Sequence, residues 1–127
     1  MKKLVLLLIA MVSIMAFAET KEYSVYGTMF YAGGKNGKGT ASGDKIIPDK
    51  VKSGEHRWVA LSKDMYAAGF RFNDTIVVTG AKADWVNGEW VVKDKMAGSK
   101  KIDFLVHRSQ GKLFKNGQVT IRKKEKK

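Results

Sequence analysis

The segment WVVKDKMAGSKKIDFLV, residues 90–106, contains two apolar runs that each carry an aspartate. Asp94 ends the first run, and Asp103 lies inside the second, between an isoleucine and a phenylalanine. Both runs are rich in β-branched and aromatic residues, which are typical of strands. A basic loop containing a glycine joins them. The segment therefore predicts two strands of a β-rich domain, each carrying one acidic side chain.

Alternation along each strand assigns these side chains to faces, because successive residues of a strand point to opposite sides. In the second strand, Asp103 lies on one face with Leu105 and His107. The other face is apolar and should pack in the core; it consists of Ile102, Phe104 and Val106. By the same rule, Asp94 should share a face with Trp90 and Val92. Two strands joined by a short loop would bring both carboxylates to one cleft.

The rest of the chain also reads as strands. Expected strands, besides the two above, cover residues 23–31, 57–61, 75–79 and 118–122. The dipeptides Asn87-Gly88 and Asn116-Gly117 each predict a hairpin turn. Ser62 should cap a brief helix that ends at Gly69. Six or seven short strands with at most one or two short helices predict an all-β domain, a small barrel or sandwich.

The N-terminus has the pattern of a secretory signal peptide. Lys2 and Lys3 precede an apolar stretch, which is followed by Ala16-Phe17-Ala18. We expect cleavage after residue 18, leaving a single domain over residues 19–127 with a short basic tail. This predicts a secreted or periplasmic protein of the cell envelope. The apolar stretch is too short for a membrane anchor, so no transmembrane segment is expected after cleavage.

Charge and cysteine content narrow the partners. The formal net charge of the 127-residue chain is +12, and removal of Lys2 and Lys3 would leave it at +10. Such a surface attracts polyanions, which outside the cytoplasm include peptidoglycan and other anionic cell-wall polysaccharides. Plain solubility is the alternative explanation of the charge. The chain has no cysteine, so it has no disulfide. We expect a monomer and no specific nucleic-acid partner.

Several familiar sites are excluded. The glycine-rich segment 32–44 lacks the Lys-Ser or Lys-Thr step of a P-loop and the third glycine of a dinucleotide fingerprint. It predicts a flexible loop beside a cleft, with the hydroxyls of Thr40 and Ser42 available to a substrate. The sequence has no metal-ligand spacing and no Gly-x-Ser-x-Gly motif. We therefore expect neither metal nor cofactor.

The position of Asp103 suggests acid chemistry. A carboxyl group held among apolar side chains, or near a second carboxylate, has a raised pKa and retains its proton. Cleavage of a glycosidic bond requires such a proton donor. The alternative is structural: an aspartate in a strand can accept hydrogen bonds from loop amides and fix a crossing of the chain.

The order of the motifs resembles a known family. Thr40-Ala41-Ser42-Gly43 is followed by VALSKDM (59–65), DTIVV (74–78), GEWVVKD (88–94) and IDF (102–104). This order is similar to that of the three-aspartate domain of the double-psi β-barrel superfamily. Relatives there include lytic transglycosylase A, rare lipoprotein A and the expansin catalytic-like domain. The resemblance covers roughly residues 25–122.

The resemblance implies a six-stranded double-psi β-barrel with a groove for polysaccharide. It makes Asp103 the catalytic acid and Asp94 the second aspartate, in a non-hydrolytic cleavage of peptidoglycan that forms a 1,6-anhydro ring. Asp64 is the candidate for the first aspartate of the family, displaced by two positions. Trp85 and His107 are further candidates for substrate contacts. A cationic barrel that binds wall glycan without cleaving it is the alternative function.

Overall fold

A computed structural model describes residues 21–34 and 37–125. The predicted signal peptide, residues 1–18, lies outside the described residues. The strands are β1 (Tyr23–Tyr31), β2 (Trp58–Ser62), β3 (Thr75–Thr79), β4 (Gly88–Met96), β5 (Lys101–Val106) and β6 (Gly117–Lys123). The helices are α2 (Pro48–Lys52), α3 (Lys63–Ala67) and the 3-10 helices η1 (Asp84–Val86) and η2 (Arg108–Leu113).

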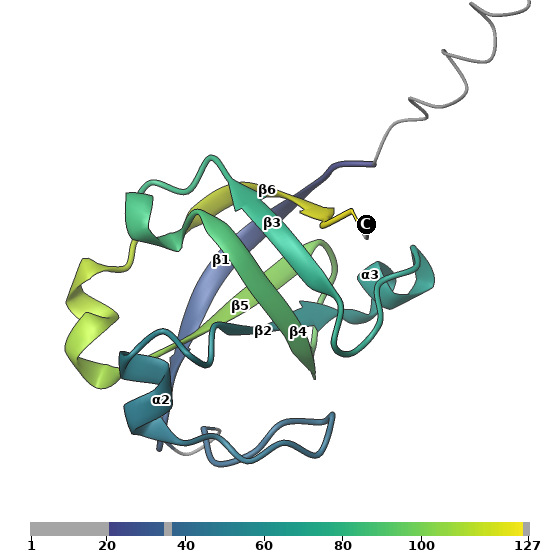
Figure 1. The fold of residues 1–127 in the computed structure, drawn as a ribbon. Coiled ribbons are helices and arrows are strands. Elements are labelled where there is room, and N and C mark those ends of the chain that lie inside the picture. Colours follow the sequence, from purple (N-terminus) through teal and green to yellow (C-terminus); the bar gives the residue numbers. More distant parts are fainter. Residues whose placement is uncertain (1–20, 35–36, 126–127) are drawn as a thin grey trace, which may run out of the picture.

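The six strands close into a barrel in the order β1-β5-β2-β4-β3-β6 (Figure 1). Neighbours β1 and β5 are parallel, as are β2 and β4, and the other four pairs are antiparallel. Closure leaves no unpaired sheet edge. Strands β4 and β5, although consecutive in the chain, are separated in the ring by β2. This crossover arrangement confirms the predicted all-β barrel with only short helices.

The barrel interior is filled by alternate residues of every strand. Trp90 and Phe104 meet edge to face with ring centroids 4.9 Å apart, and both are buried. Truncating a ring of this kind to alanine typically costs about 3–5 kcal/mol. The predicted core face of β5 is confirmed; it consists of Ile102, Phe104 and Val106, all at 0 % exposure.

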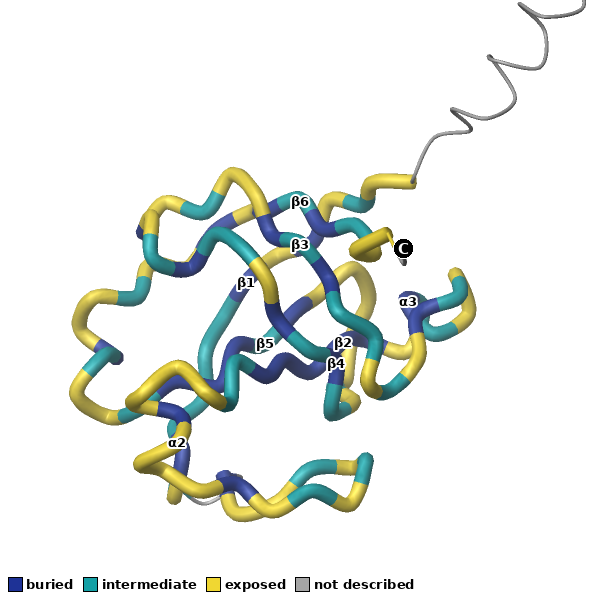
Figure 2. The backbone as a smooth tube through the Cα atoms, viewed as in Figure 1, coloured by how far each residue is buried: buried dark blue, intermediate teal, exposed yellow. Residues whose placement is uncertain are grey.

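A second apolar cluster lies on the outer face of β5 and β2, beneath the segment that contains α2. It comprises Ala32, Ile46, Val51, Trp58 and Leu105. Trp58 is the residue of β2 in this cluster, and all five residues of that strand are buried (Figure 2).

Two predicted hairpins are wrong. Trp85 and Val86 form part of η1, and Gly88 begins β4 with φ 111°, so Asn87-Gly88 ends a 3-10 helix instead of joining two strands. Gly117 begins β6, which pairs with β1 and β3 and not with β5. Asn116-Gly117 therefore precedes a strand that lies between β1 and β3 in the ring and does not join two neighbouring strands.

Candidate functional site

Asp94 and Asp103 stand on either side of Ala60. Ala60 pairs with Asp94 across the β2–β4 ladder and with Asp103 across the β2–β5 ladder. All three residues line one groove of about 250 Å³, together with Phe30, Lys95 and Met96. The methyl group of Ala60 leaves room above β2, so the two carboxylates open into a common space. The sequence predicted that both carboxylates reach one cleft, and in the structure both aspartates line the same groove.

A β-bulge in β4 produces this arrangement. The register with β2 skips Lys93, so that Val92 and Asp94 lie opposite consecutive residues of β2. Trp90 and Val92 are buried in the core. One extra residue reverses the face of everything that follows it, which turns Asp94 outward. The prediction that Asp94 shares a face with Trp90 and Val92 is therefore wrong, and this bulge is the reason that Asp94 reaches the groove.

Asp103 is partly buried, and its carboxyl group accepts one hydrogen bond from the part of the chain that the structure describes. The Thr28 hydroxyl donates to Asp103 Oδ1 at 2.8 Å, from the neighbouring strand β1. Burial raises the pKa of the Asp103 carboxyl, and the charge of Asp94 raises it further, while the Thr28 hydrogen bond lowers it. The net direction is upward, which favours a carboxyl group that retains its proton.

Asp94 has contrasting surroundings. Its Oδ1 accepts hydrogen bonds from the backbone N–H groups of Ala41 at 3.0 Å and Lys95 at 2.8 Å. Two N–H donors on one oxygen are the partners of an ionised carboxylate. The Tyr66 hydroxyl donates to the Asp94 backbone carbonyl and holds the end of β4 in place. The groove thus contains two unlike carboxyl groups. The anionic form of Asp103 is disfavoured by burial, whereas Asp94 accepts two backbone hydrogen bonds.

The loop that carries Thr40 and Ser42 lies against Asp94. Ser42 N–H donates to the Lys93 carbonyl at 3.1 Å, next to the Ala41 contact with Asp94. The two hydroxyls, predicted to be available to a substrate, hydrogen-bond each other at 2.7 Å, and Ser42 also donates to Asp44. In this structure the pair stabilises the loop that holds the Asp94 carboxylate.

Asp64 stabilises the loop between β4 and β5 by accepting hydrogen bonds from it. Its carboxylate accepts from the Ser62 hydroxyl at 2.6 Å, the Lys100 N–H at 2.9 Å and the Ser99 hydroxyl at 3.2 Å. The Ser62 hydroxyl in turn accepts from Lys101 N–H at 3.0 Å. These bonds lower the pKa of Asp64, with the Ser62 contribution the largest. Asp64 is not among the residues that line the groove.

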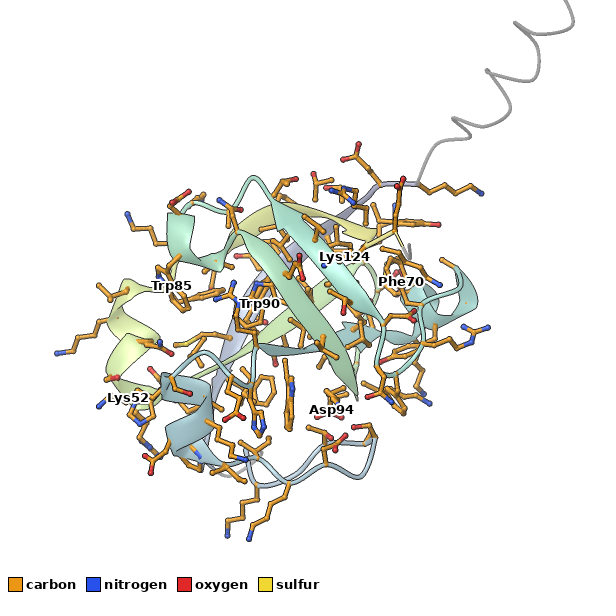
Figure 3. All side chains as sticks on the ribbon, in the orientation of Figure 1. Lys52, Phe70, Trp85, Trp90, Asp94 and Lys124 are labelled. Carbon is orange, nitrogen blue, oxygen red and sulfur yellow. The ribbon has the colours of Figure 1, made fainter. Side chains whose placement is uncertain are left out.

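Trp85 and His107 also lie outside the groove lining. Figure 3 shows Trp85 and Asp94 at opposite ends of β4. The Trp85 indole N–H donates to the Leu113 carbonyl at 3.3 Å, and its ring packs on Phe114. His107 follows β5 and caps η2 by accepting from Ser109 N–H. The structure does not bring either residue to the two aspartates.

Sequence reasoning missed three residues of the site: Thr28, Phe30 and Ala60. Each comes from a strand whose neighbours are set by the barrel crossover, and local periodicity carries no signal for that pairing. The bulge at Lys93 was not predicted either. Strict alternation after Trp90 and Val92 would point the charged side chain of Asp94, in the run Lys93-Asp94-Lys95, into the core. A charged residue at a core position was the signal from which a bulge could have been predicted.

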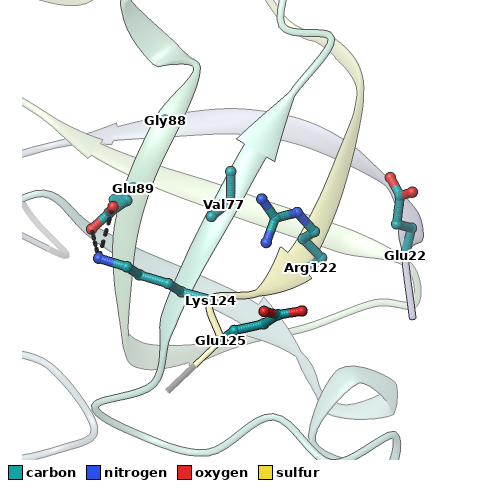
Figure 4. A pocket seen from close by; sticks show the side chains of 7 residues that line it. All are labelled: Glu22, Val77, Gly88, Glu89, Arg122, Lys124 and Glu125. Atoms are coloured by element: carbon teal, nitrogen blue, oxygen red, sulfur yellow. Dashed lines mark hydrogen bonds and ion pairs between the residues drawn. The ribbon is translucent and has the colours of Figure 1, made fainter. Parts of the chain in front are cut away.

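A larger hollow lies elsewhere, over β3, β4 and β6 (Figure 4). It has a volume of about 810 Å³ and a mixed-charge lining that includes Glu22, Glu89, Arg122 and Lys124. Lys124 pairs with Glu89 at 3.0 Å. This open hollow carries no acid held among apolar side chains, so the smaller groove with Asp94 and Asp103 is the better candidate.

Residues 21–34 and 37–125 contain no group of three or more His, Cys, Asp or Glu side chains that could hold a metal ion. Within the same ranges, no helix has the length and hydropathy needed to cross a membrane.

The comparisons with known proteins bear on the fold. No protein-family model matches this sequence, and no curated protein sequence matches it. Among solved structures, the chain is similar to the apo form of an expansin from Clavibacter michiganensis, with a TM-score of 0.57 and 15 % identity. The match covers 84 % of this chain and 52 % of the expansin, so the chain spans about half of that protein. The crossover ring of six strands and this likeness identify the fold as an expansin-like double-psi β-barrel.

Proposed function

We propose that this protein is an exported cell-wall protein that cleaves the glycan strand of peptidoglycan as a lytic transglycosylase. Asp103 acts as general acid and then as general base, and Asp94 assists it as an anion. The observation that carries the proposal is the pair of unlike carboxyl environments in one groove across Ala60. Acid–base pairs in enzymes are typically made of groups whose surroundings favour opposite protonation states.

The proposed chemistry returns the acid to its starting state. Asp103 gives its proton to the glycosidic oxygen, and the bond from that oxygen to C1 breaks. Positive charge that develops at C1 and the ring oxygen is stabilised by the Asp94 carboxylate, which is held by the N–H groups of Ala41 and Lys95. The 6-hydroxyl of the same sugar then attacks C1 as the Asp103 carboxylate takes its proton. The products are a 1,6-anhydro sugar and a shortened glycan with a new hydroxyl.

The expansin-like fold and the excess of Lys and Arg over Asp and Glu, 24 against 12, support an anionic cell-wall polysaccharide as the substrate. The predicted signal peptide supports export to the envelope. The groove lining combines the apolar residues Phe30 and Met96 with charged residues, which suits the mixed polar and apolar faces of a sugar ring.

Digestion of purified sacculi tests the proposal. Wild-type protein should release anhydro-muropeptides, and Asp103→Asn should release at least about 100-fold less, since general acid–base groups typically contribute 10²–10⁴. Asp49→Asn, an exposed aspartate of α2 outside the groove, is the matched control and should retain activity. Absence of anhydro products with the wild type across the pH range, or full activity of Asp103→Asn, would refute the cleavage mechanism.

The net charge, +12 for the full chain and +10 after removal of Lys2 and Lys3, favours a second candidate, a cationic barrel that binds wall glycan without cleaving it. A sacculus pull-down at increasing salt separates the two. If the protein is a binding module, the sacculi should retain the wild type and Asp103→Asn equally. Both proteins should dissociate as the salt concentration rises, and neither should release a soluble fragment.

A further inference from the structure

Lys95 is a cation of the groove that has no anionic partner among residues 21–34 and 37–125. It lines the groove together with Asp94 and Asp103, and its side chain is exposed. Within the described part of the chain, no carboxylate lies within ion-pair distance of its ammonium group. Its neighbour Lys93 differs, because Lys93 Nζ lies 2.9 Å from Asp44 Oδ2 and is the inner member of an ion pair.

Two aromatic rings hold the Lys95 ammonium in place. Nζ lies 5.4 Å from the ring centroid of Tyr66 and 5.6 Å from that of Phe72. The rings themselves meet edge to face with centroids 5.6 Å apart, and Tyr66 is anchored by its hydroxyl on the Asp94 carbonyl. Cation–π contacts fix the position of an ammonium group while leaving its charge available to an anion.

The charges of the groove explain why such a cation would be needed. Asp94 presents a negative charge beside Asp103, and a glycan that carries carboxylate groups would be repelled by it. A neutral glycan would meet no such repulsion and would gain nothing from an exposed ammonium. A positioned cation in the same groove lining reverses this preference, because opposite charges in a partly enclosed site attract more strongly than in water.

We infer that Lys95 is the specificity-determining residue of the groove, and that it binds a carboxylate substituent of the glycan and so selects acidic glycans over neutral ones. This inference rests on the proposed function only in that the groove binds glycan. It assigns a separate role to Lys95, which takes no part in the proton transfers of Asp103.

Binding in the Asp103→Asn background tests this role, because no cleavage is then required. The probes are glycan oligosaccharides from peptidoglycan that bear lactyl carboxylates and the same oligosaccharides with the carboxyls chemically reduced to alcohols. We expect the acidic probe to bind about three- to fivefold more tightly, the range of an exposed ion pair. Adding Lys95→Gln should abolish the preference, and Lys95→Arg should retain it. Lys112→Gln in η2 makes the same change of charge outside the groove and should leave the preference intact.

The outcomes separate this inference from the proposed function. Equal binding of both probes to the Asp103→Asn protein that retains Lys95 would overturn the role of Lys95. An undiminished preference after Lys95→Gln is added would overturn it as well. Release of anhydro-muropeptides by the wild type would stand in either case. Failure of both probes to bind would also overturn the role of Lys95. Since Lys95 is exposed, Lys95→Gln should keep the wild-type circular dichroism spectrum, which excludes misfolding as the cause of a loss.

Discussion

Asp94 and Asp103 face each other across Ala60, one from the strand parallel to β2 and one from the strand antiparallel to it. The barrel crossover puts β2 between two strands that are consecutive in the chain. As a result, two carboxyl groups from one hairpin-like segment reach the same groove from opposite sides. Their unlike surroundings, apolar for Asp103 and rich in N–H donors for Asp94, follow from that placement.

Asp103 should be a site where function opposes stability. Burial raises its pKa in the folded protein, so ionisation is harder there than in the unfolded chain. Below pH 3.8, the ordinary pKa of an aspartate, the Asp103 carboxyl is protonated in both the folded and the unfolded chain, so it does not destabilise the fold. As the pH rises above 3.8, the unfolded chain releases the proton first, and wild type loses stability relative to Asp103→Asn. Melting temperatures of both proteins at about pH 3 and about pH 7 measure this, with a larger advantage for the variant expected at pH 7. An advantage that does not grow with pH would contradict the direction of the shift.

Thr28 should tune the acid. Its hydroxyl donates to Asp103 Oδ1 and lowers the pKa of that carboxyl. Thr28→Val removes the donor with little change of shape, so the pKa of Asp103 should rise further, while Thr28→Ser should leave it near the wild-type value. The pH dependence of the Asp103 carboxyl carbon signal in NMR spectra provides the measurement. A lower pKa in Thr28→Val would show that the hydroxyl is not a donor to Asp103.

Asp64 should contribute to stability, because its carboxylate accepts three hydrogen bonds that fix the loop between β4 and β5. Its pKa is lowered, chiefly by the Ser62 hydroxyl. The stabilisation is therefore present above the ordinary value of 3.8 and is lost as the pH falls below it. Asp64→Ala should cost about 1 kcal/mol of unfolding free energy near neutral pH. Glu55→Ala, an exposed acid outside this network, is the control and should be neutral. Urea denaturation at several pH values gives both quantities, and an equal cost in acid would argue against the carboxylate network.

Arg57 should be irreplaceable by lysine. Its guanidinium lies 3.9 Å from the ring centroid of Trp90 and donates to the carbonyls of Glu89 and Trp85. A planar fork can stack and reach several acceptors at once, whereas an ammonium group cannot. We expect Arg57→Lys to lower the unfolding free energy by about 2 kcal/mol in urea denaturation. Arg122→Lys, on the outer side of β6, should change it little, and equal effects of the two substitutions would contradict this role.

The sequence could predict what depends on local pattern. Alternation in residues 102–106 correctly separated the core residues from Asp103. The apolar neighbours of Asp103 favoured a raised pKa, but the nearby lysines favoured a lowered one, and only the burial of Asp103 in the barrel gives the direction. What failed depends on pairing between distant segments. The bulge at Lys93 arises from the register with β2 and reverses the face of Asp94. Gly117 begins a strand that pairs with β1 and β3, and no local turn signal could distinguish that pairing from a hairpin with β5.

The direct test of the central claim is the titration of Asp103 by carboxyl-carbon NMR in the wild type and in Asp94→Asn. The account predicts a pKa above the ordinary value of 3.8 in the wild type, and a lower pKa in Asp94→Asn, because the charge of Asp94 is one cause of the rise. An Asp103 that titrates at or below 3.8 in the wild type and does not respond to Asp94→Asn would contradict the proposal that this groove holds a coupled acid and anion.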